Sequence, residues 1–135
     1  MSACVIDTSA IMAYLNEENG AGTSESWLDR GATISALCVQ ETTANLVQRG
    51  VDQESALEMI NALGLETHSL DFALAIDGGA LISVTQPKGL SHGDGACLSL
   101  ARRLGLPAVT ADRVWAEIAD DVGVEVILVR STSFS

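Results

Sequence analysis

Residues 4–15 read CVIDTSAIMAYL, and the interpretation of the whole chain starts from this stretch. An apolar run from Ala3 to Ile6 is followed at once by the carboxylate of Asp7 and by two hydroxyls, and a helical pattern then extends to Leu15. This order predicts a strand, a turn and a helix. It places Asp7 at the carboxyl end of the strand, which is where open parallel sheets bind ligands. The alternative is that Asp7 serves only as the N-cap of the helix, a position that Asp favours.

The composition predicts one globular domain. The chain has 135 residues, of which 47% are hydrophobic, and this suits a single core. No apolar run approaches the ~20 residues of a membrane span, and the N-terminus lacks the basic segment of a signal peptide. The three cysteines lie in apolar segments without Cys-x-x-Cys spacing, which indicates reduced core thiols. We therefore expect a cytoplasmic protein without membrane contact, with a domain at 1–130 and a flexible tail at 131–135.

Strand and helix patterns alternate along the chain. We expect strands at 3–6, 32–34, 65–70, 107–109 and 124–128, helices at 10–15, 21–30, 35–49, 52–63, 71–84, 94–104 and 114–119, and a loop at 85–90. Such alternation predicts an α/β fold with a mainly parallel sheet.

Two further carboxylates follow the pattern set by Asp7. Asp112 comes just after the strand at 107–109 and is preceded by the hydroxyl of Thr110, so it repeats the strand, turn and helix order. Asp94 opens a helix on its inward face. Each also has a simpler interpretation, because Asp112 suits an N-cap and Ser91 with Asp94 has the spacing of a capping box.

A fourth carboxylate, Glu41, lies inside the helix predicted at 35–49. Its neighbours three and four residues away are mostly apolar, so it is predicted to face inward. A carboxylate in such a place is unfavourable unless it is paired or binds a metal. The alternative is a glutamate at the rim of the core, which packs its stem and reaches water with its head.

Taken together, Asp7, Glu41, Asp94 and Asp112 are predicted to lie near one end of one sheet. Such a cluster cannot stay fully ionised without a cation, because like charges raise one another's pKa. A set of oxygen ligands without Cys or His indicates Mg²⁺ or Mn²⁺ rather than Zn²⁺. Water bound to such an ion can attack a phosphodiester. Whether Asp77 or His92 joins the site stays open, and a solvated position is the simpler interpretation of both.

With these acids in place, the chain resembles the PIN-domain ribonucleases of the VapC type, which are the toxins of bacterial and archaeal toxin–antitoxin pairs. The resemblance is carried by residues 4–15, the helix with Glu41, LSHGDGACLSLARRLGLP at 90–107 and VTADRVW at 109–115. It covers nearly all of residues 3–129.

The resemblance implies a three-layer α/β/α sandwich with a central parallel sheet. It implies that the catalytic, metal-binding acids are Asp7, Glu41, Asp94 and Asp112, supported by the hydroxyls of Ser9 and Thr110. It also implies an endoribonuclease that cuts RNA with Mg²⁺ or Mn²⁺, forms a homodimer and is held inactive by a cognate antitoxin.

A formal net charge of −11 normally argues against a nucleic-acid partner. That argument weakens if bound cations neutralise several carboxylates. Lys88, Arg113 and His92 lie in segments next to the acids and are the residues expected to guide an RNA backbone. The alternative function is a catalytically inactive PIN-like or receiver-like α/β module that only binds a partner. A receiver needs a phosphoacceptor Asp on a mid-chain strand and a later strand-end Lys, and neither is evident.

Overall fold

The computed structural model describes residues 2–130 and is built around a five-stranded sheet. Every pairing between neighbouring strands is parallel. The spatial order is β3-β2-β1-β4-β5, which places β1 at the centre. The strands are β1 (Cys4–Ile6), β2 (Ala32–Ser35), β3 (Glu66–His68), β4 (Ala108–Thr110) and β5 (Val126–Leu128). All five expected strands are present, and the expected parallel α/β fold is confirmed. The tail predicted at 131–135 lies outside the described residues.

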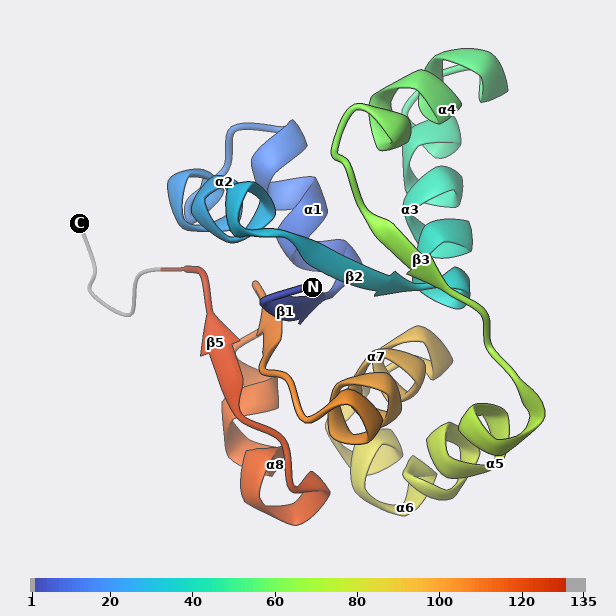
Figure 1. Ribbon diagram of the computed structural model, residues 1–135, viewed down its shortest axis with the longest axis vertical. Helices are drawn as coiled ribbons and strands as arrows, with labels where there is room; N and C mark the ends of the chain where they lie inside the picture. Colours follow the sequence, from blue (N-terminus) through green and yellow to red (C-terminus); the bar gives the residue numbers. More distant parts are fainter. Residues whose placement is uncertain (1, 131–135) are drawn as a thin grey trace.

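Helices cover both faces of this sheet, and α1–α4 lie on one side and α5–α8 on the other (Figure 1). This is the expected three-layer arrangement. The helices are α1 (Thr8–Leu15), α2 (Ala21–Arg30), α3 (Ala36–Gln48), α4 (Gln53–Asn61), α5 (Phe72–Ala80), α6 (Ile82–Thr85), a 3₁₀ turn η1 (Gln86–Lys88), α7 (His92–Leu104) and α8 (Val114–Val122). Within residues 2–130, none of the helices has both the length and the apolar character needed to cross a lipid bilayer.

Several details differ from the sequence prediction. The single helix expected at 71–84 is divided at Leu81 into α5 and α6, and the loop expected at 85–90 contains η1. The division follows Gly78 and Gly79, which lower helix stability by roughly 1 kcal/mol each. The third strand is also shorter than expected and mostly exposed, because it lies at the edge of the sheet and has one neighbouring strand.

The core lies between the sheet and its two helical layers. It is mostly aliphatic, and Trp115 of α8 is its one fully buried aromatic side chain among the described residues. Cys4, Cys38 and Cys97 are buried and unpaired, which confirms the prediction of core thiols. The middle of α7 is buried, so this helix is held firmly and its N-terminus has a defined position.

A close contact between α5 and α7 helps to hold α7 in place. A Cβ atom at Gly95 would lie 3.0 Å from the backbone oxygen of Gly78, which is tighter than most contacts that Cβ atoms make. Backbone atoms cannot move aside as a flexible side chain would. The two helices therefore approach each other through glycine, and α7 has little freedom to shift.

We expect Gly95→Ala to lower the melting temperature relative to Gly79→Ala. Both substitutions gain the same helix propensity, about 1 kcal/mol. A Cβ at Gly79 has open space around it, whereas one at Gly95 meets Gly78, and overpacking of this kind costs about 1–3 kcal/mol. Thermal melts of the two variants measure the difference. Equal melting temperatures would show that α5 and α7 can move apart enough to accept the added Cβ without a loss of stability.

Candidate metal centre

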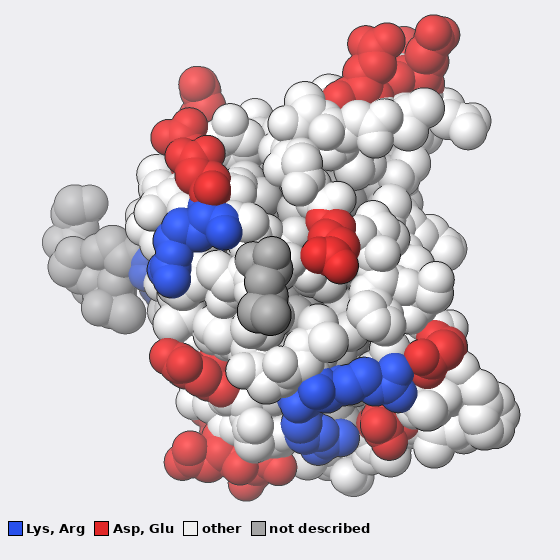
Figure 2. All heavy atoms as spheres, viewed as in Figure 1, with Lys and Arg blue, Asp and Glu red and all other residues white. Residues whose placement is uncertain are grey.

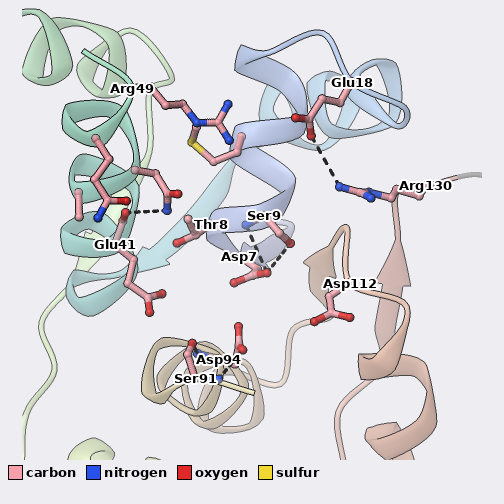
Figure 3. Close-up of a pocket in the computed structure, with 14 residues that line it drawn as sticks. Asp7, Thr8, Ser9, Glu18, Glu41, Arg49, Ser91, Asp94, Asp112 and Arg130 are labelled. Atoms are coloured by element: carbon pink, nitrogen blue, oxygen red, sulfur yellow. Dashed lines mark hydrogen bonds and ion pairs between the residues drawn. The ribbon is translucent and has the colours of Figure 1, made fainter. Parts of the chain in front are cut away.

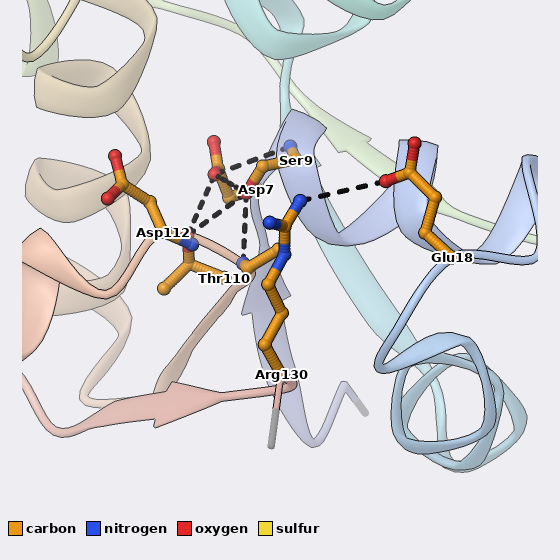
Figure 4. Close-up of polar contacts among 7 residues, drawn as sticks. Asp7, Ser9, Glu18, Thr110, Asp112 and Arg130 are labelled. Carbon is orange, nitrogen blue, oxygen red and sulfur yellow. Dashed lines mark hydrogen bonds and ion pairs between the residues drawn. The ribbon is translucent and has the colours of Figure 1, made fainter. Parts of the chain in front are cut away.

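Asp7 lies at the carboxyl end of β1 and is the N-cap of α1. Its Oδ2 accepts hydrogen bonds from the Ser9 hydroxyl at 2.6 Å, the Thr110 hydroxyl at 3.0 Å and the Ser9 amide at 3.4 Å. Figure 4 shows these groups converging on one side of the carboxylate. The side chain is almost fully buried, with 2% of its surface exposed. The cap role is therefore real, but it occupies one oxygen and leaves Oδ1 available to a neighbouring pocket.

The environment of Asp7 disfavours its charge. Burial raises the pKa of this carboxyl from an ordinary 3.8 to about 7, and the nearby charge of Asp94 contributes to the rise. The hydrogen bonds from Ser9 and Thr110 act in the opposite direction, because they stabilise the carboxylate. A carboxyl with this raised pKa loses its proton readily when a cation binds beside it, because the cation stabilises the charged form.

The turn after β4 is tied to the turn after β1. The Ser9 hydroxyl lies 3.1 Å from that of Thr110 and accepts a hydrogen bond from the Ala111 amide at 2.9 Å. The Asp112 amide donates to the Thr110 hydroxyl at 3.1 Å, and Oδ1 of Asp112 accepts from the Val114 amide at 3.0 Å. The two hydroxyls thus link Asp7 and Asp112, whose strands are neighbours in the sheet.

Asp94 lies in the first turn of α7 and forms a true capping box with Ser91. The Ser91 amide donates to Oδ2 of Asp94 at 2.8 Å, and the Asp94 amide donates to the Ser91 hydroxyl at 3.2 Å. Burial raises the pKa of Asp94, the Ser91 hydrogen bonds oppose that rise, and the charge of Asp112 adds to it. The capping interpretation is confirmed, and the same carboxylate also faces the pocket (Figure 3).

Glu41 extends from the middle of α3 toward the N-terminus of α7 (Figure 3). Its side chain is partly buried, as expected from its neighbours on the helix. Burial raises the pKa of Glu41, and the charge of Asp94 raises it further, whereas a hydrogen bond from the Ser91 side chain lowers it. Among the four acids this was the one whose orientation the sequence determined least, and the structure turns it toward the other three.

The four carboxylates line one open cavity of about 500 Å³. Its floor is formed at the carboxyl ends of β1 and β4 and at the N-terminus of α7. The residues that line it are Asp7, Thr8, Ser9, Met12, Glu18, Glu41, Ala44, Asn45, Gln48, Arg49, Ser91, Asp94, Asp112 and Arg130. The four acids predicted from the sequence therefore share one pocket although they are up to 105 positions apart along the chain.

The rim of this cavity contains charged residues that sequence reasoning missed. Arg49 ends α3, and Nη2 of Arg130 lies 3.6 Å from Oε1 of Glu18. Both arginines and Glu18 border the cavity above the acids in Figure 3. The position of Arg130 could have been predicted from the sequence. It follows the carboxyl end of β5, and the carboxyl ends of β1 and β4 carry Asp7 and Asp112. Glu18 and Arg49 lie beyond helix ends and had no comparable signal.

The basic residues chosen from the sequence are placed differently. Lys88 pairs with Glu117 at 3.2 Å and does not line the cavity. His92 borders a separate cavity of about 200 Å³, and Arg113 borders another of about 340 Å³ together with Asp112 and Arg130. Asp77 is exposed on α5 and lines none of these three cavities.

The chemistry of the pocket suits a hard divalent cation. It offers carboxylate oxygens, the donors that Mg²⁺ and Mn²⁺ prefer, and three of the four carboxyls have raised pKa values. In their present conformations, no three acidic, His or Cys side chains among residues 2–130 converge on one point as a complete set of ligands. A Mg²⁺ ion keeps several waters and needs few protein carboxylates, so the donor set fits a partly hydrated ion.

Comparison with known proteins identifies the family. The sequence matches the PIN domain family over residues 4–121, and no curated protein matches it. Similar folds occur in a toxin–antitoxin complex from Klebsiella pneumoniae (TM-score 0.70, 18% identity, 95% of this chain and 98% of that one). They also occur in VapC20 of Mycobacterium tuberculosis, a toxin that cleaves the sarcin-ricin loop (0.69, 15%, 84% and 93%). VapBC-5, a toxin–antitoxin system of the same organism, is a third (0.63, 21%, 95% and 99%). Because the family match extends from the first strand into the last helix, the chain belongs to the PIN domain family.

Proposed function

We propose that this PIN domain is a divalent-metal-dependent endoribonuclease and the toxin of a toxin–antitoxin pair. The observation that carries the proposal is the pocket in which Asp7, Glu41, Asp94 and Asp112 come together from four separate parts of the chain. Solved structures of similar fold include toxins and toxin–antitoxin complexes, and one of those toxins cleaves RNA at the sarcin-ricin loop.

In this proposal Asp7, Glu41 and Asp94 hold Mg²⁺ or Mn²⁺, and Asp112 assists with the same ion or with a second one. Such an ion, when bound, lowers the pKa of a water ligand and stabilises the charge that develops on the phosphate. Ser9 and Thr110 fix the Asp7 carboxylate through Oδ2, and Ser91 fixes that of Asp94. These hydroxyls and amides position the acids. Because a metal-bound water would be the nucleophile, no protein side chain is needed in that role.

The rim arginines are proposed to guide the RNA backbone in place of Lys88. Arg49 and Arg130 border the acidic cavity, and Arg130 also borders the neighbouring cavity that contains Arg113. Other cations are engaged elsewhere: Arg30 stacks on Trp27, and Arg103 pairs with Asp71. On the face shown in Figure 2, basic side chains form only small areas next to acidic ones. RNA contact should therefore be concentrated at the pocket.

The proposal includes protein partners. We expect an antitoxin to cover the α3–α4 face, where Val47 is 48% and Leu57 is 58% exposed. Leu46 of α3 is buried in the protein's own core and is not available to a partner. We expect a homodimer as well. The large exposed apolar side chains of α5, Phe72 and Ile76, are one turn apart on one face and are the proposed dimer surface.

The buried, unpaired cysteines agree with a reducing compartment such as the cytoplasm.

A ribonuclease assay with the purified chain tests the proposal. We expect RNA cleavage with Mg²⁺ or Mn²⁺, loss of cleavage in excess chelator and recovery when metal is restored. Asp94→Asn should be inactive, while Asp77→Asn, the same change at an exposed position outside the pocket, should keep full activity. Cleavage at full rate in excess chelator would refute the metal dependence. A wild-type chain that binds RNA or a partner but never cleaves would support the non-catalytic alternative.

A further inference from the structure

The N-terminal turn of α7 has a feature that capping alone does not require. Gly93 is buried, follows the N-cap Ser91 by two residues and has an ordinary helical backbone, so nothing in its φ angle calls for glycine. A Cβ atom built on Gly93 would, however, overlap the carboxylate of Glu41. The space that a side chain would occupy at Gly93 is thus already filled by the head of Glu41.

The approach of α3 to α7 explains why the space is so tight. The Cys38 thiol donates a hydrogen bond to the carbonyl oxygen of Gly93 at 3.4 Å, so α3 contacts the backbone of α7 directly. Glu41 lies one helical turn beyond Cys38 and therefore on the same face of α3. Its carboxylate is directed onto the first turn of α7, where only a residue without a side chain leaves room for it.

Ser91 supplies the polar half of the same contact. Its side chain faces the Glu41 carboxylate and lowers the pKa of Glu41, its Oγ accepts from the Asp94 amide, and its own amide donates to Oδ2 of Asp94. One residue therefore contacts both acids. Two carboxylates that repel each other stay side by side because the same turn holds each of them.

We propose that Ser91 and Gly93 are positioning residues for the metal centre. In this inference the missing side chain of Gly93 provides the space, and the Ser91 hydroxyl a polar contact, that hold the Glu41 carboxylate next to Asp94. The metal-binding part of the inference rests on the proposed function, whereas the geometric part concerns Glu41 and Gly93 alone and can be tested without metal or RNA.

Gly93→Ala is the informative substitution because the obstructing atoms belong to the end of a flexible side chain. The backbone of α7 can stay in place while the Glu41 carboxylate is displaced from Asp94. We expect Mn²⁺ affinity, measured by calorimetry without RNA, to fall about 10–100-fold, which is the usual effect of removing a group that orients a metal ligand. Gly79→Ala, where a Cβ has open space, is the matched control and should leave Mn²⁺ affinity unchanged.

A double-mutant cycle with Glu41→Ala separates positioning from a general effect on folding. In chelator, Gly93→Ala should raise the melting temperature more in the Glu41→Ala background than in the wild-type background, because the obstruction is gone and only the gain in helix propensity remains. In the Glu41→Ala background, Gly93→Ala should also have no further effect on Mn²⁺ affinity. Independent, additive effects in both measurements would overturn the inference.

Ser91→Ala provides the second test, with Ser35→Ala as its control. Ser35 caps α3 through the Leu37 amide and does not line the pocket, so its loss should lower the melting temperature without changing Mn²⁺ affinity. Ser91→Ala should lower both. Coupling between Gly93 and Glu41 in chelator, in a protein that binds no Mn²⁺, would refute the proposed function and leave the geometric inference standing. Normal Mn²⁺ binding by Gly93→Ala would refute the positioning role of Gly93 and leave the proposed function standing.

Discussion

Replacing Asp7 by asparagine should strongly reduce RNA cleavage and, in the metal-free protein at pH 8, raise the melting temperature by several degrees. The two effects have one cause. Asp7 is buried, its pKa is raised to about 7 by that burial and by the charge of Asp94, and at pH 8 it is held ionised at the expense of folding. Asparagine keeps the shape and removes the charge.

The size of the gain follows from competing contributions. A rise in pKa from 3.8 to about 7 corresponds to roughly 4 kcal/mol of stability lost at high pH. The amide oxygen of Asn can still accept the hydrogen bonds from Ser9 and Thr110, whereas its NH₂ group needs a partner in the pocket, and an unsatisfied one costs about 1–3 kcal/mol. Because the gain from removing the charge exceeds this cost, the net change in folding free energy stabilises the variant. Activity should fall by roughly 10²–10⁴-fold, the consequence of losing several kcal/mol of metal-assisted stabilisation.

Thermal melts in chelator and a cleavage assay with Mn²⁺ measure these effects. Asp52→Asn is the control, because the pKa of Asp52 is lowered where that of Asp7 is raised. Hydrogen bonds from Ser55 to this exposed N-cap stabilise its charged form, so its charge does not oppose folding. It should not raise the melting temperature and should leave cleavage intact. If Asp7→Asn melts lower than wild type in chelator and still cleaves RNA, Asp7 is only a cap of α1.

The sequence predicted the sheet well because all its strands except β3 are short, mostly apolar runs next to polar turns. Asp7 and Asp112 could be placed together for the same reason, since carboxyl ends of neighbouring parallel strands share an edge. Asp94 was less certain, because capping and pocket-facing roles seemed to compete. The structure shows that they coexist, with Oδ2 bonded to Ser91 and the carboxylate still facing the cavity.

What the sequence could not supply depends on contacts between distant segments. The overlap between Glu41 and a side chain at Gly93 arises from the packing of α3 on α7, and no local pattern encodes that distance. The pairing of Lys88 with Glu117 is similar: both residues are ordinary surface charges in the sequence, and their meeting takes Lys88 away from the pocket. The break at Leu81 has a local cause, because Gly78 and Gly79 weaken the helix that was predicted as continuous over 71–84.

Without metal, the folded protein should become less stable as pH rises. For Asp7 the folded-state pKa of about 7 exceeds the unfolded value near 3.8, so its contribution to stability is fully present below about pH 4 and is lost as pH rises to about 7. Glu41 and Asp94, whose pKa values are also raised, act in the same direction. In chelator, wild type should therefore become less stable between pH 4.5 and pH 8, whereas Asp7→Asn should lose clearly less.

Added Mn²⁺ should reverse the trend in wild type. Metal binds the deprotonated carboxylates, so the stabilisation that it provides by mass action grows as pH rises through the same interval. Urea unfolding of wild type and Asp7→Asn at pH 4.5, 6 and 8, with chelator and with Mn²⁺, measures both slopes. Asp52 and Asp71 do not confuse the comparison, because their pKa values are lowered and they matter only below about pH 4. Parallel pH profiles for the two proteins in chelator would mean that the charge of Asp7 is already compensated within the folded chain, and the pocket would then have no need of a cation.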